Sequence, residues 1–174
     1  STLTHENLCG YIFKSKSPSC GLGRVPVYEK FGSNKVRHGL GMFANAFTNT
    51  FPLIPTEEEG RLNDSKIREN FIIRVFSFGR LQTLFLKRFS FGKLVRFHTQ
   101  HKFLLLAHSR EHYDNLGKLV ANGKSIKPSV LKEKYGRLFM EALTFKSTPK
   151  KNTDVLLHMM GFFKKLLNKG EKAD

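Results

Sequence analysis

The chain has 174 residues, of which 40% are hydrophobic and 17 are phenylalanine, so it can bury one good core or two small ones. Its longest uninterrupted apolar run covers only residues 103–107, far too short for a membrane span, and no secretory signal is visible. Two cysteines make no disulfide framework, and without histidines at ligand spacing they make no complete zinc site. We therefore expect a cytoplasmic protein with no membrane partner.

The formal net charge of +16 is the second strong signal, because self-repulsion of this size is normally offset by a polyanionic partner. Residues 1–82 carry a net charge of +4, whereas residues 83–174 carry +12. An anionic membrane is the weaker alternative, since the charge is not gathered on one amphipathic helix with an aromatic insertion face. We expect a nucleic-acid partner that binds the second segment.

Residues 1–82 predict part of a small α/β domain. Two short strands, over residues 10–13 and 24–28, flank a connection punctuated by proline and glycine. Residues 40–51 place apolar side chains at helical spacing before two prolines end the helix. The first segment therefore has two strands and one or two helices.

A long helix, which Asn63 or Asp64 can cap, leads out of this domain through Phe78. Only helical periods follow, so residues 83–174 read as an all-α domain and the whole chain as an α+β protein. Four further helices are predicted, over residues 91–107, from Ser109 through 119, over 128–143 and over 155–167. A region that starts at Thr148-Pro149 leads into the last of them.

The segment 14–21, Lys-Ser-Lys-Ser-Pro-Ser-Cys-Gly, presents one thiol among hydroxyls in a loop after the first strand. Glycines let backbone amides approach a ligand closely, and Lys14 and Lys16 favour the thiolate form of Cys20. A thiol placed there suits catalysis or metal ligation. A buried cysteine in an ordinary turn is the alternative, and the local sequence leaves both open.

Three histidines mark the predicted helix 91–107 and its end. On a helix that turns 100° per residue, His98, His101 and His108 fall within an arc of about 80°, beside Lys102. This polar stripe predicts a phosphate-gripping or hydrogen-bonding face, with plain helix packing as the alternative. Metal ligation is disfavoured because the spacing is not the i, i+4 pair of a helical zinc motif.

Two sets of motifs resemble known families. The first set resembles the later part of the thiouracil desulfidase domain and comprises residues 10–21, 51–55, 57–64 and 68–71. The second set resembles the YbgA-type helical domain that often follows it, and comprises residues 97–99, 101–102, 107–109, 113, 116–117, 120–121, 155–156, 158 and 161–164. Such fusions are similar to desulfidases that act on 4-thiouridine in tRNA.

The resemblance implies an enzyme that removes sulfur from a thiolated uracil with a 4Fe-4S cluster held by three cysteines. Cys20 matches the last of these ligands, and Ser17 matches a serine of the family's active site. Soft thiolates suit such a cluster, and an open iron can act as a Lewis acid. The other two cysteines lie upstream in the family, so we expect this chain to be an internal fragment, inactive alone and without a cluster of its own.

The same resemblance implies that the basic helical domain binds tRNA. Phosphate contacts need cations rather than a base-reading pattern, so the expected nucleic-acid-binding residues are Lys87, Arg88, Lys93, Arg96, His98, His101, Lys102, Lys150 and Lys151. The alternative is a nonenzymatic, basic nucleic-acid-binding module whose Ser/Cys loop is only structural.

Overall fold

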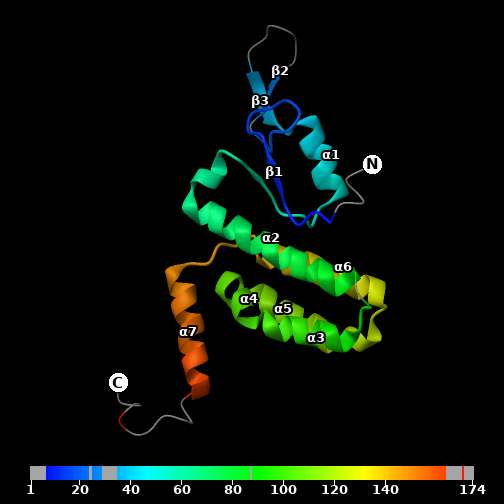
Figure 1. Ribbon diagram of the computed structural model, residues 1–174, viewed down its shortest axis with the longest axis vertical. Helices are drawn as coiled ribbons and strands as arrows, with labels where there is room; N and C mark the ends of the chain where they lie inside the picture. Colours follow the sequence, from blue (N-terminus) through cyan, green and yellow to red (C-terminus); the bar gives the residue numbers. More distant parts are fainter. Residues whose placement is uncertain (1–6, 24, 29–34, 87, 164–169, 171–174) are drawn as a thin grey trace. The chain divides into compact units, whose positions relative to one another are not determined.

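A computed structural model describes residues 7–23, 25–28, 35–86, 88–163 and 170 (Figure 1). The chain divides into two compact units, Ser1–Lys87 and Arg88–Asp174. The strands all lie in the first unit and the second is helical, which confirms the α+β class. The division predicted between residues 82 and 83 falls inside α2 (Ser65–Leu86), because that helix continues four residues further.

The described residues of the first unit form two small two-stranded sheets. β1 (Tyr11–Phe13) pairs in parallel with β4 (Thr56–Glu58), and β2 (Val25–Tyr28) pairs antiparallel with β3 (Lys35–Gly39). The two predicted strands are therefore present, and each has a partner that the sequence pattern did not predict. Backbone bonds extend the β1–β4 pair at both ends, from Tyr11 N–H to the Pro55 carbonyl and from Glu59 N–H to the Phe13 carbonyl.

An aromatic cluster forms the core beside β1. Phe13 from the strand and Phe47 from α1 (Met42–Thr50) are fully buried, with ring centroids 5.5 Å apart in edge-to-face geometry. Tyr11 and Phe43 pack against the same rings, because positions 43 and 47 share one face of the helix. Each fully buried phenylalanine contributes about 1.5–3 kcal/mol, so this cluster fixes α1 against the strand.

Asp64 begins α2 as the sequence predicted. Its Oδ1 atom accepts the backbone N–H groups of Lys66 and Ile67, at 2.8 and 3.0 Å. These two amides have no partner inside the helix, so the carboxylate satisfies them and complements the helix dipole. A short 3₁₀ turn, η2 (Arg61–Asn63), carries the chain from β4 to this cap.

The second unit contains α3 (Phe91–Gln100), α4 (Lys102–His108), α5 (Arg110–Ala121), η3 (Gly123–Ser125), α6 (Pro128–Ala142) and α7 (Pro149–Phe163). The single helix predicted over 91–107 is wrong: the chain leaves helical geometry at His101, where φ is −100° and ψ is 7°. Ser109 caps α5 as predicted, with its Oγ accepting from the His112 amide. α7 begins at Pro149, where the sequence predicted the start of the region that leads into the helix, and residues 164–167 of the predicted helix lie outside the described residues.

The core of the second unit gathers around α6. Leu131, Tyr135 and Phe139 are fully buried at a spacing of four residues, which places them on one helix face. Leu105 of α4 and Leu116 of α5 are buried as well. In the described part of the chain, no helix has both the length and the apolar composition needed to span a bilayer.

Candidate functional site

The loop that carries Ser17 and Cys20 starts where β1 ends. β1 and β4 run parallel in register, so their carboxyl ends meet at one edge of the sheet, where the loop begins and where β4 delivers Glu58 and Glu59. Ligand sites of α/β proteins lie beyond this edge, because loops from neighbouring strands converge there. The topology thus gives the predicted loop a typical site location.

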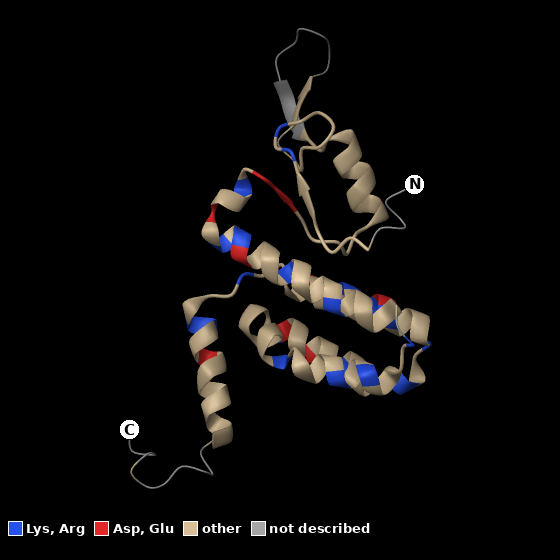
Figure 2. Cartoon of the chain, in the orientation of Figure 1, with Lys and Arg blue, Asp and Glu red and all other residues tan. Residues whose placement is uncertain are grey.

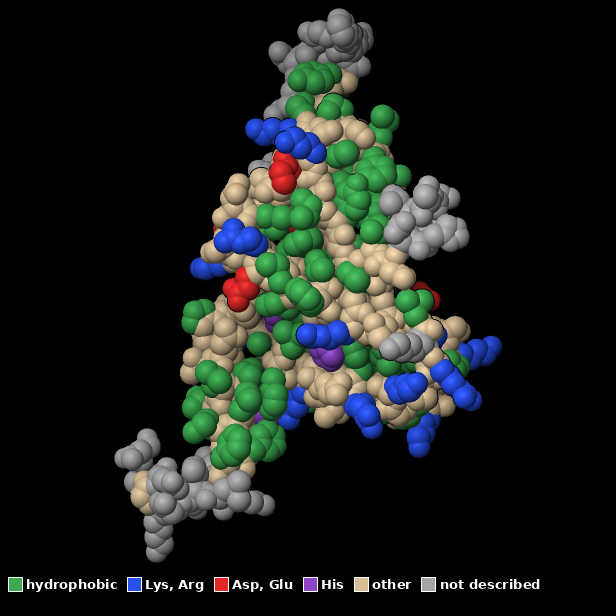
Figure 3. Space-filling model, viewed as in Figure 1, with side chains coloured by type: hydrophobic (Ala, Val, Ile, Leu, Met, Phe, Trp, Pro, Cys, Tyr) green, Lys and Arg blue, Asp and Glu red, His purple; other side chains and the backbone are tan. Residues whose placement is uncertain are grey.

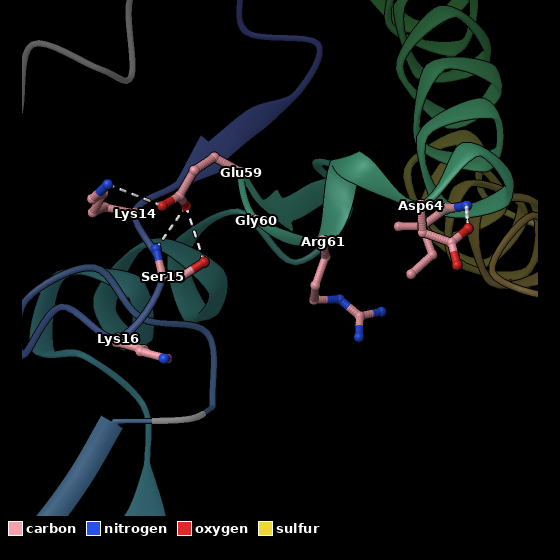
Figure 4. Close-up of a pocket in the computed structure, with 8 residues that line it drawn as sticks. Lys14, Ser15, Lys16, Glu59, Gly60, Arg61 and Asp64 are labelled. Atoms are coloured by element: carbon pink, nitrogen blue, oxygen red, sulfur yellow. Dashed lines mark hydrogen bonds and ion pairs between the residues drawn. The ribbon is translucent and has the colours of Figure 1, made fainter.

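Two glutamates of β4 and its end hold the loop in place. Glu58, which is 2% exposed, accepts the Leu22 amide through Oε1 at 2.8 Å. Glu59 Oε2 accepts the Ser15 amide at 2.6 Å and the Ser15 hydroxyl at 3.1 Å, while Lys14 Nζ lies 3.2 Å from Glu59 Oε1 (Figure 4). One carboxylate therefore fixes each end of the loop.

The Glu59 carboxylate is ionised across the whole neutral range. Burial disfavours its charge, but the Ser15 amide, the Lys14 ammonium and the Ser15 hydroxyl outweigh burial and lower the pKa of Glu59 to about 2. In the sequence, Glu58 and Glu59 are visible only as part of the acidic run 57–59. Their role was hidden because Ser15 lies 44 positions away from Glu59.

The Ser17 hydroxyl closes a turn inside the loop. Its Oγ accepts the Ser19 and Cys20 amides, at 3.3 and 3.2 Å, and its carbonyl accepts the Gly21 amide at 2.9 Å. A hydroxyl oxygen has two lone pairs, so with both in use the remaining capacity of Ser17 is to donate its proton. Cys20, a free thiol, is half-buried and packs against the aromatic core cluster.

The loop also forms the cap of α1. The Met42 amide donates to the Pro18 carbonyl, and the Phe43 and Ala44 amides both donate to the Ser19 carbonyl. Gly41 lies so close that a Cβ atom there would stand 2.3 Å from the Ser19 oxygen. The loop carbonyls therefore accept the amides in the first turn of α1 that have no partner inside the helix. These bonds fix the position of Ser17 and Cys20 relative to the helix.

The described residues do not by themselves match an iron–sulfur centre. Cys20 is the one thiol of the loop, and the described part of the chain has no group of three or more His, Cys, Asp or Glu side chains that could hold a metal. Cys9 lies elsewhere in the unit, with its Sγ 3.3 Å from Gln82 Oε1 and against Gly79. Within the loop, Cys20 has the soft donor atom that such a cluster requires.

An open cleft of about 660 Å³ borders the Ser15 end of the loop (Figure 4). Its lining comes from three stretches of the first unit: the loop, the end of β4 and the start of α2. The residues are Lys14, Ser15, Lys16, Glu59, Gly60, Arg61, Asp64 and Ile67. Glu57 holds Arg61 through a 2.7 Å contact to Nε, and this hydrogen bond raises the pKa of the guanidinium.

The histidines of the second unit do not form the predicted solvent-facing stripe. His101 and His108 are only 6% and 2% exposed, and their Nδ1 atoms lie 2.8 and 2.6 Å from the carbonyls of Phe97 and Phe145. The break between α3 and α4 changes the helical phase on which the stripe depended. Helix packing, the alternative interpretation, is what the structure shows for both residues.

His98 is half-buried and electrically neutral near pH 7. Burial lowers its pKa, and the proximity of His101 lowers it further. Its Nδ1 lies 3.3 Å from the Tyr135 hydroxyl, and its ring stacks on Tyr113 at 5.3 Å. Burial raises the pKa of Tyr135, so this hydroxyl keeps its proton. His98 therefore offers a phosphate no positive charge.

The predicted lysines and arginines of the second unit fall into two groups. Arg88, Lys93, Arg96 and Lys150 are exposed, although Lys93 Nζ also donates to the Arg88 carbonyl at 2.8 Å, and Figure 2 shows how such cations recur along the helices. Lys102 instead lies over the Phe103 and Phe162 rings, and Lys151 donates to the His108 carbonyl at 2.6 Å. Lys87 lies outside the described residues. Binding of nucleic acid by any of these residues stays a prediction.

Helix α7 combines a basic first turn with an apolar remainder. It packs against α4, where the Phe103 ring lies 6.0 Å from His158 and 6.4 Å from Phe162. Leu157 and Phe162 are nevertheless 65% and 62% exposed, and Figure 3 shows apolar side chains over this helix on the face in view.

Two protein families match separate parts of the chain. Residues 1–59 match 2-thiouracil desulfurase, and residues 102–174 match a family described as "Protein of unknown function (DUF1722)". "Uncharacterized protein YbgA" from Escherichia coli (strain K12) is 26% identical over 112 residues, which are 64% of this chain and 66% of that protein. The match thus spans slightly less than two thirds of this curated relative. No solved structure matches the chain.

These matches cover most of the motifs, although residues 60–64 and 68–71 lie beyond the first match and residues 97–99 and 101 lie before the second. The loop with Ser17 and Cys20 lies in the first match, and α4 to α7 lie in the second. The resemblance drawn from the motifs is therefore confirmed: the chain joins a segment that matches 2-thiouracil desulfurase to a YbgA-like segment that matches DUF1722.

Proposed function

We propose that this chain is part of a desulfidase that removes sulfur from a thiolated uracil, with 4-thiouridine in tRNA as the substrate. The match of residues 1–59 to 2-thiouracil desulfurase supports the sulfur-removing role. The observation that carries the proposal is the loop itself. Glu58 and Glu59 hold both ends of the loop, and α1 holds its middle, so Ser17 and Cys20 sit on a rigid support at the carboxyl edge of a parallel strand pair.

Ser17 and Cys20 have different roles in this proposal. The Ser17 oxygen accepts two backbone amides, so its hydroxyl suits donation of a proton to the departing sulfur, while the attacking water supplies the new oxygen and returns a proton to Ser17. Cys20 provides the soft donor atom of the loop.

A 4Fe-4S cluster belongs to this proposal as the cofactor of the longer protein, with Cys20 as one ligand. Its thiolate chemistry suits that role, but the described residues supply no further ligands, so no step is assigned to the cluster here. The basic second unit contributes tRNA binding through exposed cations such as Arg88, Lys93 and Arg96. A cytoplasmic location would be consistent with a tRNA substrate.

The test is desulfuration of tRNA containing 4-thiouridine by the native protein, prepared anaerobically and followed by loss of the thiocarbonyl absorbance. We expect Cys20→Ser to abolish turnover and to lower the iron content. Ser17→Ala should lower kcat by about 10²–10⁴, the usual contribution of a positioned proton donor, with the iron content unchanged. Cys9→Ser is the matched control, since that thiol lies against α2 and outside the loop.

Full activity in Cys20→Ser would contradict the proposed role of the loop. A native protein with neither iron nor turnover that still binds tRNA would favour the alternative, a nonenzymatic nucleic-acid-binding module. The high net charge of +16 is the observation that supports this second candidate.

A further inference from the structure

Helix α7 carries apolar side chains on two of its sides. One side contacts α4, where the Phe103 ring lies 6.0 Å from His158 and 6.4 Å from Phe162. On a second side, four apolar residues follow the spacing i, i+3, i+4 and i+7, which places side chains in one row along a helix. These residues are Leu156, Met159, Met160 and Phe163, and we call them the α7 seam.

The α7 seam is open to solvent. Its four side chains are between 37% and 60% exposed, and among the described residues of α7 none is buried. Figure 3 shows apolar side chains gathered over this helix on the face in view. Single exposed apolar residues are ordinary on a protein surface, but four in one helical row are the anchors with which a helix packs against a partner. The seam therefore predicts a binding surface.

The side of α7 that carries the seam is uncharged, although the chain has a net charge of +16. The positions that flank the seam are Pro149, Asn152, Thr153 and Leu157. The charged residues of the helix, Lys150, Lys151 and Asp154, lie about 130° or more from the centre of the seam at 100° per residue. Nucleic acids and anionic membranes are held by cations at the contact, which this side of α7 lacks.

A second copy of the chain fits a surface with this charge pattern. Two basic molecules repel each other, and like charges directly opposite across an interface cost free energy. Two copies can therefore meet closely where neither carries a charge, while salt screens charges that lie more than about 8 Å apart. Met and Phe, which make up three of the four seam residues, are also enriched in protein interfaces.

We propose that two copies of this chain associate through the α7 seam, with α7 of one protomer against α7 of its partner about a two-fold axis. Such a contact uses the same residues on both copies. The seam and Leu157 expose about 500 Å² per copy, taking about 200 Å² for a fully exposed side chain of this size. About 1,000 Å² is then buried in total, the lower limit for a specific interface, so we expect a reversible dimer.

The first test is sedimentation velocity of the 174-residue chain and of the native protein, each at about 1–300 μM. We expect a monomer–dimer equilibrium in both, with a Kd of about 1–100 μM for an interface of this size. Added salt should tighten the dimer, because it screens the repulsion between two basic copies and leaves the apolar contact in place. Salt would instead weaken an association bridged by nucleic acid.

Paired substitutions at Met160 test whether the partner is a second copy. The middle of the seam lies close to the two-fold axis and meets its own copy, whether the two helices run parallel or antiparallel. Met160→Lys and Met160→Glu should each weaken the dimer at least about tenfold, since like charges then face each other, whereas an equimolar mixture of the two should restore it. Val130→Lys and Val130→Glu are the matched controls, because Val130 of α6 is also an exposed apolar residue of the second unit. Circular dichroism checks that each variant keeps its helix content.

Three outcomes would overturn the two-fold contact: monomers at every concentration, equal losses in the Val130 variants, or no recovery in the mixture. A dimer of the 174-residue chain beside a monomeric native protein would overturn it as well, and would assign the seam to another segment of the native chain. Binding to phosphatidylglycerol vesicles that Met160→Glu abolishes, without any dimer, would assign the seam to a membrane instead.

Discussion

At Glu59, one carboxylate holds three groups of the loop, and its ionisation should control the order of that loop. The pKa of Glu59 is lowered to about 2 from an ordinary value of 4.5. The unfolded chain therefore takes up a proton at higher pH than the folded chain, so the stabilising contribution is complete above pH 4.5 and is lost as pH falls toward 2. The Ser15 amide resonance should titrate with a midpoint near pH 2.

Two variants separate the charge of Glu59 from its hydrogen bonds. Glu59→Ala removes both and should abolish the titration and speed hydrogen exchange of the Ser15 amide. Glu59→Gln keeps an acceptor but no charge, so exchange should be intermediate and the titration absent. Glu69→Gln changes an exposed carboxylate of α2 and serves as the control. A midpoint near pH 4.5 in the unaltered chain would show that Glu59 is not held as described.

At the scale of the element, the backbone of the loop lies so close to Gly41, at the start of α1, that one added methyl group should lower the stability of the protein. Gly41→Ala would place a Cβ atom 2.3 Å from the Ser19 oxygen and 2.6 Å from the Cys20 nitrogen, both backbone atoms of the loop. Because backbone cannot rotate away as a side chain can, we expect a loss of about 1–3 kcal/mol in the free energy of unfolding, measured by urea denaturation.

Gly92→Ala is the matched comparison for this substitution. Gly92 lies in α3 and has nothing within 4 Å of the added Cβ, so alanine should stabilise the protein by up to about 1 kcal/mol through helix propensity. Equal effects of the two substitutions would show that the loop does not press on Gly41.

Elements were predictable where local signals agree with tertiary packing. Asp64 and Ser109 predict the starts of α2 and α5, because their side-chain oxygens accept backbone amides of the first helical turn. β4 was missed because Thr-Glu-Glu has weak strand propensity and forms by pairing with β1, 45 positions away in register. The break at His101 was missed because neither glycine nor proline marks it. The burial of His101 and His108 was missed for the same reason, since the predicted stripe assumed one continuous helix.

At the scale of the whole molecule, the uneven charge distribution follows the division into two units. The helical unit carries most of the excess Lys and Arg, and the Ser/Cys loop lies wholly in the other unit. The excess of Lys and Arg was visible in the sequence, but the sequence did not show which of these side chains are free to bind a phosphate and which contact other groups of the protein. Lys151 donates to the His108 carbonyl at the end of α4, and Lys102 lies over the Phe162 ring. Each of these contacts joins residues that are far apart in the sequence.

Binding of tRNA should therefore depend on particular exposed cations of the second unit. We expect the triple variant R88Q, K93Q and R96Q to weaken binding and to reduce the slope of log affinity against log salt by about 2–3, since each lost phosphate contact removes roughly one counterion. The control is the triple variant K124Q, K127Q and K134Q, which changes the net charge equally at exposed sites of the same unit. Fluorescence anisotropy with labelled tRNA measures both. Equal losses in the two variants would mean that binding follows net charge alone, and a slope unchanged in the first would remove Arg88, Lys93 and Arg96 from the interface.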